Sequence, residues 1–394
     1  MANRNGGFIG TDGLDAPDPP TGVTVSGGTD GVASISFTAP TDTGTSAITG
    51  FVATSSTGVG ATGTSSPISV SSLTLDTAVT FRVLAQNVYG YSAPSDASSS
   101  ITPSASRGVW AGGANGPSNV MQYITIATTG NTTDFGDLTV ARGDTATGAS
   151  STRMVVAGGN NNSNQSNVTD YITIATTGNA TDFGDTLTEH RLFNGGLSNS
   201  IRFVMAGGEN GAGSAQNVIQ YFTIATTGNA SDFGNLLATS YGANGAASTT
   251  RGVWMGGLNG TNVIQYVTIG TTGNATDFGD LVSTRSGGGS VSSGTRAVTG
   301  GTIVNSQDLM DYITIATTGN GTDFGNLSVG RGKCGALGST TRGVWGGGVI
   351  DSSGANQDVM DYITIASTGN ASDFGDLASA LDRVVGMSNG HGGL

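Results

Sequence analysis

One phrase, YITIATTGN followed by a short polar stretch and DFG, occurs six times in near-identical form and constrains the fold more than any other feature. The copies begin at Tyr123, Tyr171, Tyr221, Tyr266, Tyr312 and Tyr362, so their spacings are 48, 50, 45, 46 and 50 residues. β modules that repeat with such a period form propeller blades rather than helical solenoids. The sequence therefore predicts an array of one β unit over residues 104–394.

Composition supports an all-β chain and removes several classes of partner. Glycine accounts for 67 of 394 residues and charged side chains for 10%, which is typical of short strands joined by tight polar turns. No apolar run approaches the ~20 residues of a membrane span. The net charge of −13 repels phosphate backbones, so we expect no nucleic acid partner. Cys334 is the only cysteine, which excludes an internal disulfide.

The N-terminal segment, residues 1–14, is rich in glycine and asparagine around one small apolar spot at Phe8 and Ile9. We interpret it as a flexible docking arm. It lacks the apolar stretch and cleavage site of a signal peptide, so we expect the chain to be made in a cytoplasm.

Residues 15–103 alternate apolar and polar side chains between turn signals, which predicts a small β-sandwich. The segments PDPPTGVTV, SFTAP, AITGFVATS and LTLDTAVTFRVLAQNVYGYSAPSD resemble, in this order, a fibronectin type III domain. Phe37 stands where that family usually has a core tryptophan, and Val79 stands where it usually has the tyrosine of its corner motif. The resemblance implies a spacer or adhesion module.

Each of the six copies has the same order of parts: an arginine, a hydrophobic strand ending in double glycine, a polar loop, the tyrosine-led strand and DFG. A further strand is expected to begin near Arg142, Arg191, Tyr241, Arg285, Arg331 and Arg383, and four strands per unit make a propeller blade. The pattern resembles the kelch repeat. We expect the tyrosines to pack the blades together with six phenylalanines twelve residues further on, which stand where many kelch repeats have tryptophan: Phe135, Phe183, Phe233, Phe278, Phe324 and Phe374.

The strand count predicts how the array closes. The first unit lacks a strand before Arg107, and the last unit is followed by LDRVVGMSNG. We expect residues 382–390 to complete the first blade and to close a six-bladed ring without exposed edges.

Length varies in one loop class, from 9 to 14 residues between the double glycine and the tyrosine. Ordinary solvated turns are the default interpretation of these loops; because loops on a rigid scaffold favour binding, a glycan or protein contact is the functional alternative. Candidate positions are Asn115, Asn161, Asn210, Asn259, Asn305 and Asp351. The six Asn-x-Ser/Thr sequons, starting at Asn131, are interpreted as turn residues that bond their own backbone; calcium at these oxygens is the minor alternative.

No catalytic motif emerges from the sequence. His190 and His391 have no metal-ligand spacing with other ligands, and GRGKC around Lys333 lacks the first glycine of a phosphate loop. Paired aspartates for glycoside cleavage are present in number but no pair stands out. We therefore predict no enzyme activity, no cofactor and no metal.

The Gly-rich arm, the fibronectin-like module and kelch-like copies reading VWAGG and YITIATTGNATDFGDL are together similar to virion structural proteins of tailed phages, especially phages of marine bacteria. This resemblance implies a virion location, other virion proteins as partners and a tail fibre, appendage or adhesion role, with a host-surface glycan or receptor as target. A homo-oligomer within the particle is compatible with it. The alternatives are a capsid or tail decoration protein and a carbohydrate-active propeller enzyme.

Overall fold

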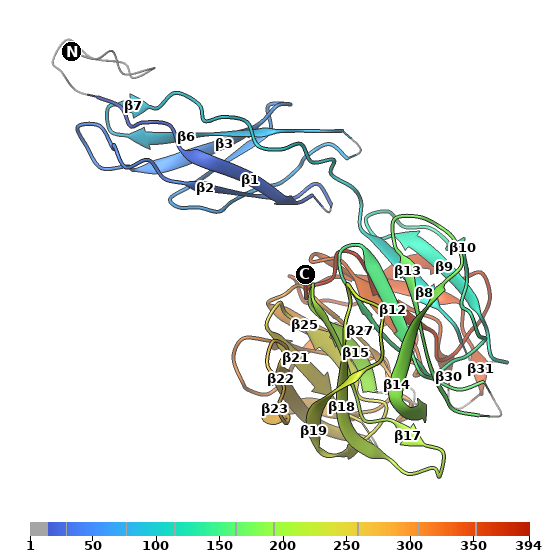
Figure 1. Cartoon of the computed structure of the whole chain (residues 1–394). Coiled ribbons are helices and arrows are strands. Elements are labelled where there is room, and N and C mark those ends of the chain that lie inside the picture. The colour runs from blue at the N-terminus through green and yellow to red at the C-terminus, as the bar shows by residue number, and fades with distance from the viewer. Residues whose placement is uncertain are drawn as a thin grey trace. The chain divides into compact units, whose positions relative to one another are not determined.

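The computed structural model describes residues 15–394 except 29, 76, 114–115, 162–163, 192–193, 258–259, 306 and 351–352. The chain divides into two compact units, Met1–Ala105 and Ser106–Leu394. Within the described residues every regular element is a β-strand, as the composition predicts, and no helix is long and apolar enough to cross a membrane. Figure 1 shows the strands along the chain and labels many of them.

The first unit contains two antiparallel sheets that enclose one core. Strands β2, β3 and β6 alternate buried and less buried residues, as their period-two sequence predicts. Phe37 and Phe51 meet in this core with ring centroids 4.8 Å apart, and Val79 is 1% exposed. One sheet has the order β1-β2-β5 (Thr21–Gly27, Ala33–Thr38, Ile68–Val70), and the other has the order β4-β3-β6-β7 (Gly60–Gly63, Gly50–Ser55, Phe81–Asn87, Gly90–Tyr91).

The second unit contains six antiparallel sheets, each built around one copy of the repeat. In order along the chain we call them the first to the sixth sheet, and we give their strands from the innermost outward. The first is β34-β8-β9-β10 (Val385–Ser388, Arg107–Ala111, Val120–Thr125, Thr133–Asp137). The second is β11-β12-β13-β14-β17 (Ala146–Ala149, Arg153–Ala157, Ser166–Thr173, Thr181–Arg191, Glu209–Asn210). The third is β15-β16-β18-β19 (Asn194–Ser198, Arg202–Ala206, Gln216–Thr223, Ser231–Ser240).

The remaining sheets follow the same plan. The fourth is β20-β21-β22-β23 (Asn244–Ala247, Arg251–Met255, Thr261–Thr268, Thr276–Arg285). The fifth is β24-β25-β26-β27 (Gly289–Ser292, Arg296–Gly300, Leu309–Thr314, Thr322–Asn326). The sixth is β28-β29-β32-β33 (Gly335–Gly338, Arg342–Gly346, Val359–Thr364, Ser372–Asp376), beside which β30 and β31 (Val349–Ile350, Ala355–Asn356) form a small hairpin.

The C-terminal strand completes the first sheet, as the strand count predicts. Val385 pairs with Ala111 and Ser388 pairs with Gly108, in antiparallel register. The innermost strands also contact one another in a cycle: β11 lies against β15, β15 against β20, β20 against β24, β24 against β28, and β34 against both β28 and β11. The six sheets of this unit therefore close on themselves.

Each hydrophobic cluster of the second unit combines residues of two neighbouring sheets. We call these interfaces between neighbouring sheets the seams. In one cluster Phe135 of the first sheet lies with Met154 and Ile172 of the second. In another, Phe374 of the sixth sheet lies with Trp110 and Ile124 of the first, so the seam that closes the ring has the same kind of core as the others. The remaining four neighbouring pairs of sheets share clusters in the same way.

The innermost strands begin later than the sequence predicts. The positions from Arg142 to Arg383 that were expected to start them lie in the segments that cross from one sheet to the next, or at the ends of the outer strands β14 and β23. The reason is that Arg142, Arg285 and Arg331 point into seams, where all three are fully buried.

Candidate functional site

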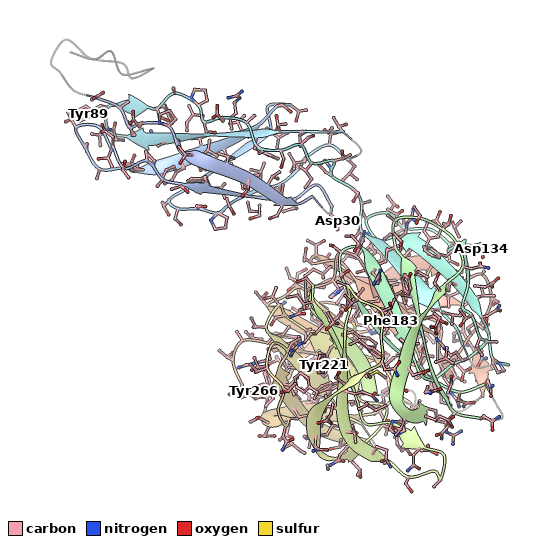
Figure 2. The ribbon with its side chains drawn as sticks, viewed as in Figure 1. Asp30, Tyr89, Asp134, Phe183, Tyr221 and Tyr266 are labelled. Atoms are coloured by element: carbon pink, nitrogen blue, oxygen red, sulfur yellow. The ribbon has the colours of Figure 1, made fainter. Side chains whose placement is uncertain are left out.

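The twelve aromatic residues of the repeat lie in the seams of the ring. Each tyrosine meets the phenylalanine of its own copy edge to face, with centroids 5.9 to 6.0 Å apart. The phenylalanines are at most 3% exposed, whereas the tyrosines are half-buried. Figure 2 labels Phe183, Tyr221 and Tyr266 among them. Edge-to-face pairs add to the stabilisation that burial provides, so packing accounts for this part of the motif.

The arginine that opens each copy fastens its sheet to the next one. Arg107 stacks over Tyr123 at 4.4 Å and donates hydrogen bonds to the carbonyl oxygens of Ile174 and Ala175 in the second sheet, at 3.1 and 2.9 Å. Arg342 of the sixth sheet does the same to Ile126 and Ala127 of the first. The other four arginines repeat the contact: Arg153, Arg202, Arg251 and Arg296.

The six sequon asparagines bond the neighbouring sheet and not their own turn, which corrects the sequence-based interpretation. Asn179 Oδ1 accepts a hydrogen bond from the Asp137 backbone at 3.0 Å, and Asn131 Oδ1 accepts one from Asp376 at 3.1 Å. The other four copies form equivalent bonds. These amide oxygens therefore bond neighbouring sheets to each other across the seams.

A second set of polar contacts, which the sequence analysis missed, is of two kinds, an ion pair in three copies and a neutral hydrogen bond in the other three. The residue before each tyrosine is aspartate in three copies, and it forms a buried ion pair with the arginine seven residues after the phenylalanine of the preceding copy. These pairs are Arg142–Asp170, Arg285–Asp311 and Arg331–Asp361, at 2.9, 3.2 and 2.8 Å. In the other three copies the residue is glutamine and accepts a backbone N–H instead: Gln122 from Ala378, Gln220 from Leu187 and Gln265 from Leu237.

The residue seven positions after each phenylalanine changes together with the aspartate or glutamine that it faces. Where the acceptor is glutamine, the position that carries arginine elsewhere is His190, Ser240 or Leu381. A comparison of the six copies position by position could have found this matched exchange. Buried charges need partners, and each of these aspartates has its partner within the scaffold.

The variable loops gather on one face of the ring, which we call the loop face. Gly143 and Gly332, each just before an innermost strand, bridge to Asn160 and Val349 in these loops. The loop face therefore also carries the end of the central channel, which is lined by residues of the innermost strands such as Thr147, Gly245 and Ser290.

Of the candidate loop positions, Asn161, Asn210 and Asn305 are described. Asn161 Oδ1 accepts from the Asn164 backbone at 2.9 Å, and Asn210 Oδ1 accepts from Ala212 and Ser214. Asn305 has a left-handed backbone, with φ at 57°. These asparagines shape their loops. Asn115, Asn259 and Asp351 lie outside the described residues, as do the docking candidates Phe8 and Ile9.

Three charged residues stand at the channel mouth on the loop face. Asp144, Lys333 and Arg383 have φ values of 57°, 52° and 54° at the position where Gly242 and Gly287 stand in two other copies. Arg383 Nη1 lies 3.1 Å from Asp144 Oδ2. Burial raises the pKa of the Asp144 carboxyl, and Arg383 counters the shift. A left-handed backbone strains residues other than glycine, so these three residues lower the folding stability relative to glycine at the same positions.

A polar hollow of about 260 Å³ lies beside the mouth, where the second and third sheets meet. Its wall includes Asn160 and Gln165 from one loop, Gly211 and Gly213 from the next, and Glu189 and Arg191 at the end of β14. Arg191 Nη2 pairs with Glu209 Oε1 at 2.8 Å, and Gln165 Nε2 donates to the Asn210 carbonyl at 2.7 Å. Strand β17 joins β14 through His190 and Arg191, so this part of the loop face is braced.

No group of three or more histidine, cysteine, aspartate or glutamate side chains suited to a metal gathers among the described residues. Cys334 is buried, and burial raises the pKa of its thiol, which keeps it protonated. His190 is also buried, and burial lowers its pKa. These residues fit interior packing.

Comparison with known proteins identifies no family. No protein-family model matches the chain, and no curated protein matches it. Among solved structures, domains A168-A170 of titin match at 31% identity with a TM-score of 0.22, over 23% of this chain and 33% of that one.

Proposed function

We propose that this protein is a structural and adhesion component of a tailed-phage virion. In this proposal the second unit is a six-bladed kelch-like propeller whose loop face meets the bacterial host, and residues 15–103 are a fibronectin type III-like spacer. Residues 1–14 dock on other virion proteins. The phage assignment comes from the sequence resemblance. The binding role is supported by the separation, within the ring, of repeated residues in the seams from variable residues on the loop face.

This separation of repeated and variable residues is the observation on which the proposed binding role rests. The near-identical residues of the six copies are committed to the seams, through the arginine, asparagine and aromatic contacts. The residues that vary in kind and number lie on the loop face, beside the channel mouth and the polar hollow. A rigid scaffold that presents variable polar loops on one face suits recognition.

The test is to locate the protein on the particle and to ask whether it adheres. Antibodies raised against the whole chain and labelled with gold should decorate the tails of purified phage particles in electron micrographs. Gold on the head shell would replace the adhesion role with capsid decoration, and unlabelled particles would overturn the virion assignment. Fluorescent full-length chain should also bind host cells, and shortening of host polysaccharide by the purified chain would favour the enzyme alternative.

A further inference from the structure

The mouth of the central channel is framed by the residue that stands nine positions after each phenylalanine of the repeat. Five of these six residues are described: Asp144, Gly242, Gly287, Lys333 and Arg383. Backbone hydrogen bonds link four of them in succession, because the Gly287 N–H donates to Gly242, the Lys333 N–H to Gly287 and the Arg383 N–H to Lys333. The backbone therefore fixes where the side chains at the mouth begin.

All five described residues have a left-handed backbone, with φ values between 52° and 69°. Glycine adopts this conformation without strain, yet three copies carry a charged side chain instead. Strained residues gather at functional sites, where the surrounding structure holds them in place. A role for the charges of Asp144, Lys333 and Arg383 would explain why these residues stand where the backbone favours glycine.

Lys333 differs from the other basic residues of the second unit, because it pairs with no carboxylate and stacks on no ring among the described residues. Six arginines of this unit stack on tyrosines, and three form the buried ion pairs of the seams. The remaining two, Arg191 and Arg383, pair with carboxylates. Lys333 is half-buried and is the only lysine of the chain. Its ammonium group is therefore available to a ligand.

The cations at the mouth are more accessible than the carboxylates. The Arg383 side chain is 30% exposed, whereas Asp144 and Asp382, which it contacts, are 4% and 11% exposed. These contacts use Arg383 Nη1 and Nε, so its Nη2 forms no bond to a described residue. Neither this atom nor Lys333 Nζ is closed off from solvent. A ligand that approaches the mouth therefore meets two cationic donors.

The size and the charge of the mouth select the class of ligand. The cavity has a volume of about 120 Å³, or about four waters at ~30 Å³ each, so it admits one charged group and not a whole sugar ring. Two neighbouring cationic donors match the two oxygens of a carboxylate. A doubly charged phosphate would be opposed more strongly by Asp144 and by the chain's charge of −13.

We propose that the channel mouth binds a carboxylate group of a larger ligand, between Lys333 Nζ and Arg383 Nη2. On the other side of Lys333, Gly287 and Gly242 present no side chains, which leaves room for the rest of the ligand on the loop face. The inference deepens the proposed binding role of the loop face and rests on it. An acidic sugar and the C-terminus of a peptide both present this group, and the experiment separates them.

The experiment titrates the full-length chain, labelled with ¹³C at lysine Cε, so that the single lysine gives one NMR signal. The carboxylate ligands are methyl glucuronide and acetyl-Gly-Gly, with methyl glucoside and acetyl-Gly-Gly amide as their uncharged matches and sodium chloride as the anion control. At least one carboxylate should shift the Lys333 signal saturably, and neither its match nor chloride should do so. A response to the glucuronide alone identifies an acidic sugar, and a response to the peptide alone identifies a peptide terminus. If neither carboxylate exceeds its match and chloride, the proposal is wrong.

Two variants separate the charge of Lys333 from its backbone, with binding measured by saturation transfer to the ligand. Lys333→Gln keeps a side chain of similar length without the charge, and it should weaken binding about tenfold or more. Lys333→Gly should weaken binding as much without lowering the melting temperature, because glycine adopts the left-handed backbone freely. The matched control is Asp30→Gly, at a left-handed residue of the first unit with φ at 53°, and it should keep the affinity of the parent chain.

Three outcomes of these variants would count against the site. Binding by Lys333→Gln at the affinity of the parent would overturn it, as would equal weakening by Asp30→Gly. A lower melting temperature of Lys333→Gly would show that this lysine stabilises the fold, which removes the strain argument.

Failure of the carboxylate site is distinguishable from failure of the proposed function. Gold-labelled tails together with an unresponsive Lys333 signal would remove only the carboxylate site. Carboxylate binding by a chain that is absent from particles would keep the site and remove the virion role.

Discussion

Arg142 Nη2 lies 2.9 Å from Asp170 Oδ2, with both side chains fully buried, and this ion pair joins the segment after β10 to the second sheet. Asp170 Oδ1 also accepts a hydrogen bond from Thr139 Oγ1 at 2.6 Å, and Arg142 donates to the Val156 carbonyl at 3.1 Å. Burial lowers the pKa of the Arg142 guanidinium, and the Asp170 carboxylate opposes that shift. Each buried charge is therefore tolerated in the interior only while the other one is present.

Asp170→Ala should therefore lower the free energy of unfolding by about 3–5 kcal/mol, because it leaves a buried cation without its counter-charge. The closing seam of the same chain has an uncharged pair at the equivalent positions. There Leu381 stands in place of the arginine and Gln122 in place of the aspartate. The double variant Arg142→Leu with Asp170→Gln should recover most of the loss. Urea unfolding followed by tryptophan fluorescence measures both. A double variant no better than Asp170→Ala would show that the two seams are not equivalent.

The glycine of DFG is a second seam position that tolerates no side chain. In Gly279 the backbone φ is 145°, and an added Cβ would lie 2.5 Å from the Gly319 carbonyl oxygen of the next sheet. Gly279→Ala should therefore cost at least ~2 kcal/mol, the lower range of overpacking and backbone strain together. Thermal unfolding measures the loss.

Gly270→Ala is the matched control for that substitution. The other five copies have alanine at this position, and an added Cβ meets no atom within 4 Å. Alanine there should leave stability unchanged or raise it by about 0.4–1 kcal/mol, because it restricts the unfolded chain. If both glycine variants lost the same stability, the clash in the seam would not be the cause.

The sequence predicts the architecture of this chain better than its polar contacts. The period and the strand count are enough to place β34 beside β8, because a strand missing at one end and spare at the other leaves one economical pairing. The seam contacts could not be derived in that way. Asn131 and Asp376 are 245 residues apart, and only the curvature of the closed ring brings an asparagine turn onto the next sheet.

The candidate site was predicted at the level of a loop class but not of its residues. Length variation identified the loops that share the loop face. The asparagines chosen within them, Asn161 and Asn210, proved to shape their own turns. The polar hollow beside the channel mouth could not be predicted, because its wall combines residues of two loops and the end of β14. Which of these residues meet depends on how neighbouring sheets are placed in the ring.

Deleting residues 382–394 should lower the melting temperature by ~10 °C or more, since about 1 kcal/mol corresponds to a few degrees in a unit of this size. The deletion removes the innermost strand of the first sheet and the buried Val384 of the closing cluster. It also opens sheet edges that favour aggregation. Differential scanning calorimetry measures the change, and adding a synthetic 382–394 peptide should restore part of it. An unchanged melting curve would refute the role of this strand in closure.

The residues after β34 fold back over the ends of other sheets. Gly392 and Gly393 lie so close to the backbones of Gly294 and Ser198 that a side chain on either would collide. His391 is buried, and its Nε2 lies 3.3 Å from Ser198 Oγ. Its Nε2 lies 2.9 Å from the Ala149 carbonyl, and its Nδ1 accepts a hydrogen bond from the Gly393 N–H at 3.1 Å. The imidazole is therefore neutral, with its proton on Nε2 and its other nitrogen already facing a donor.

Burial lowers the pKa of His391 from 6.5 to about 4, which makes stability depend on pH. Because the folded pKa is depressed, the unfolded chain binds more protons between pH 6.5 and 4. The contribution is complete above pH 6.5 and falls as the pH drops through this window, by roughly 3 kcal/mol in total. His391→Gln can keep both hydrogen bonds without titrating, so its stability should fall less over the same range. Urea unfolding at intervals from pH 7.5 to 4.5 provides the comparison, and the difference between the two proteins cancels the carboxylates that titrate in both. Parallel pH profiles would show that His391 is accessible to protons in the folded chain.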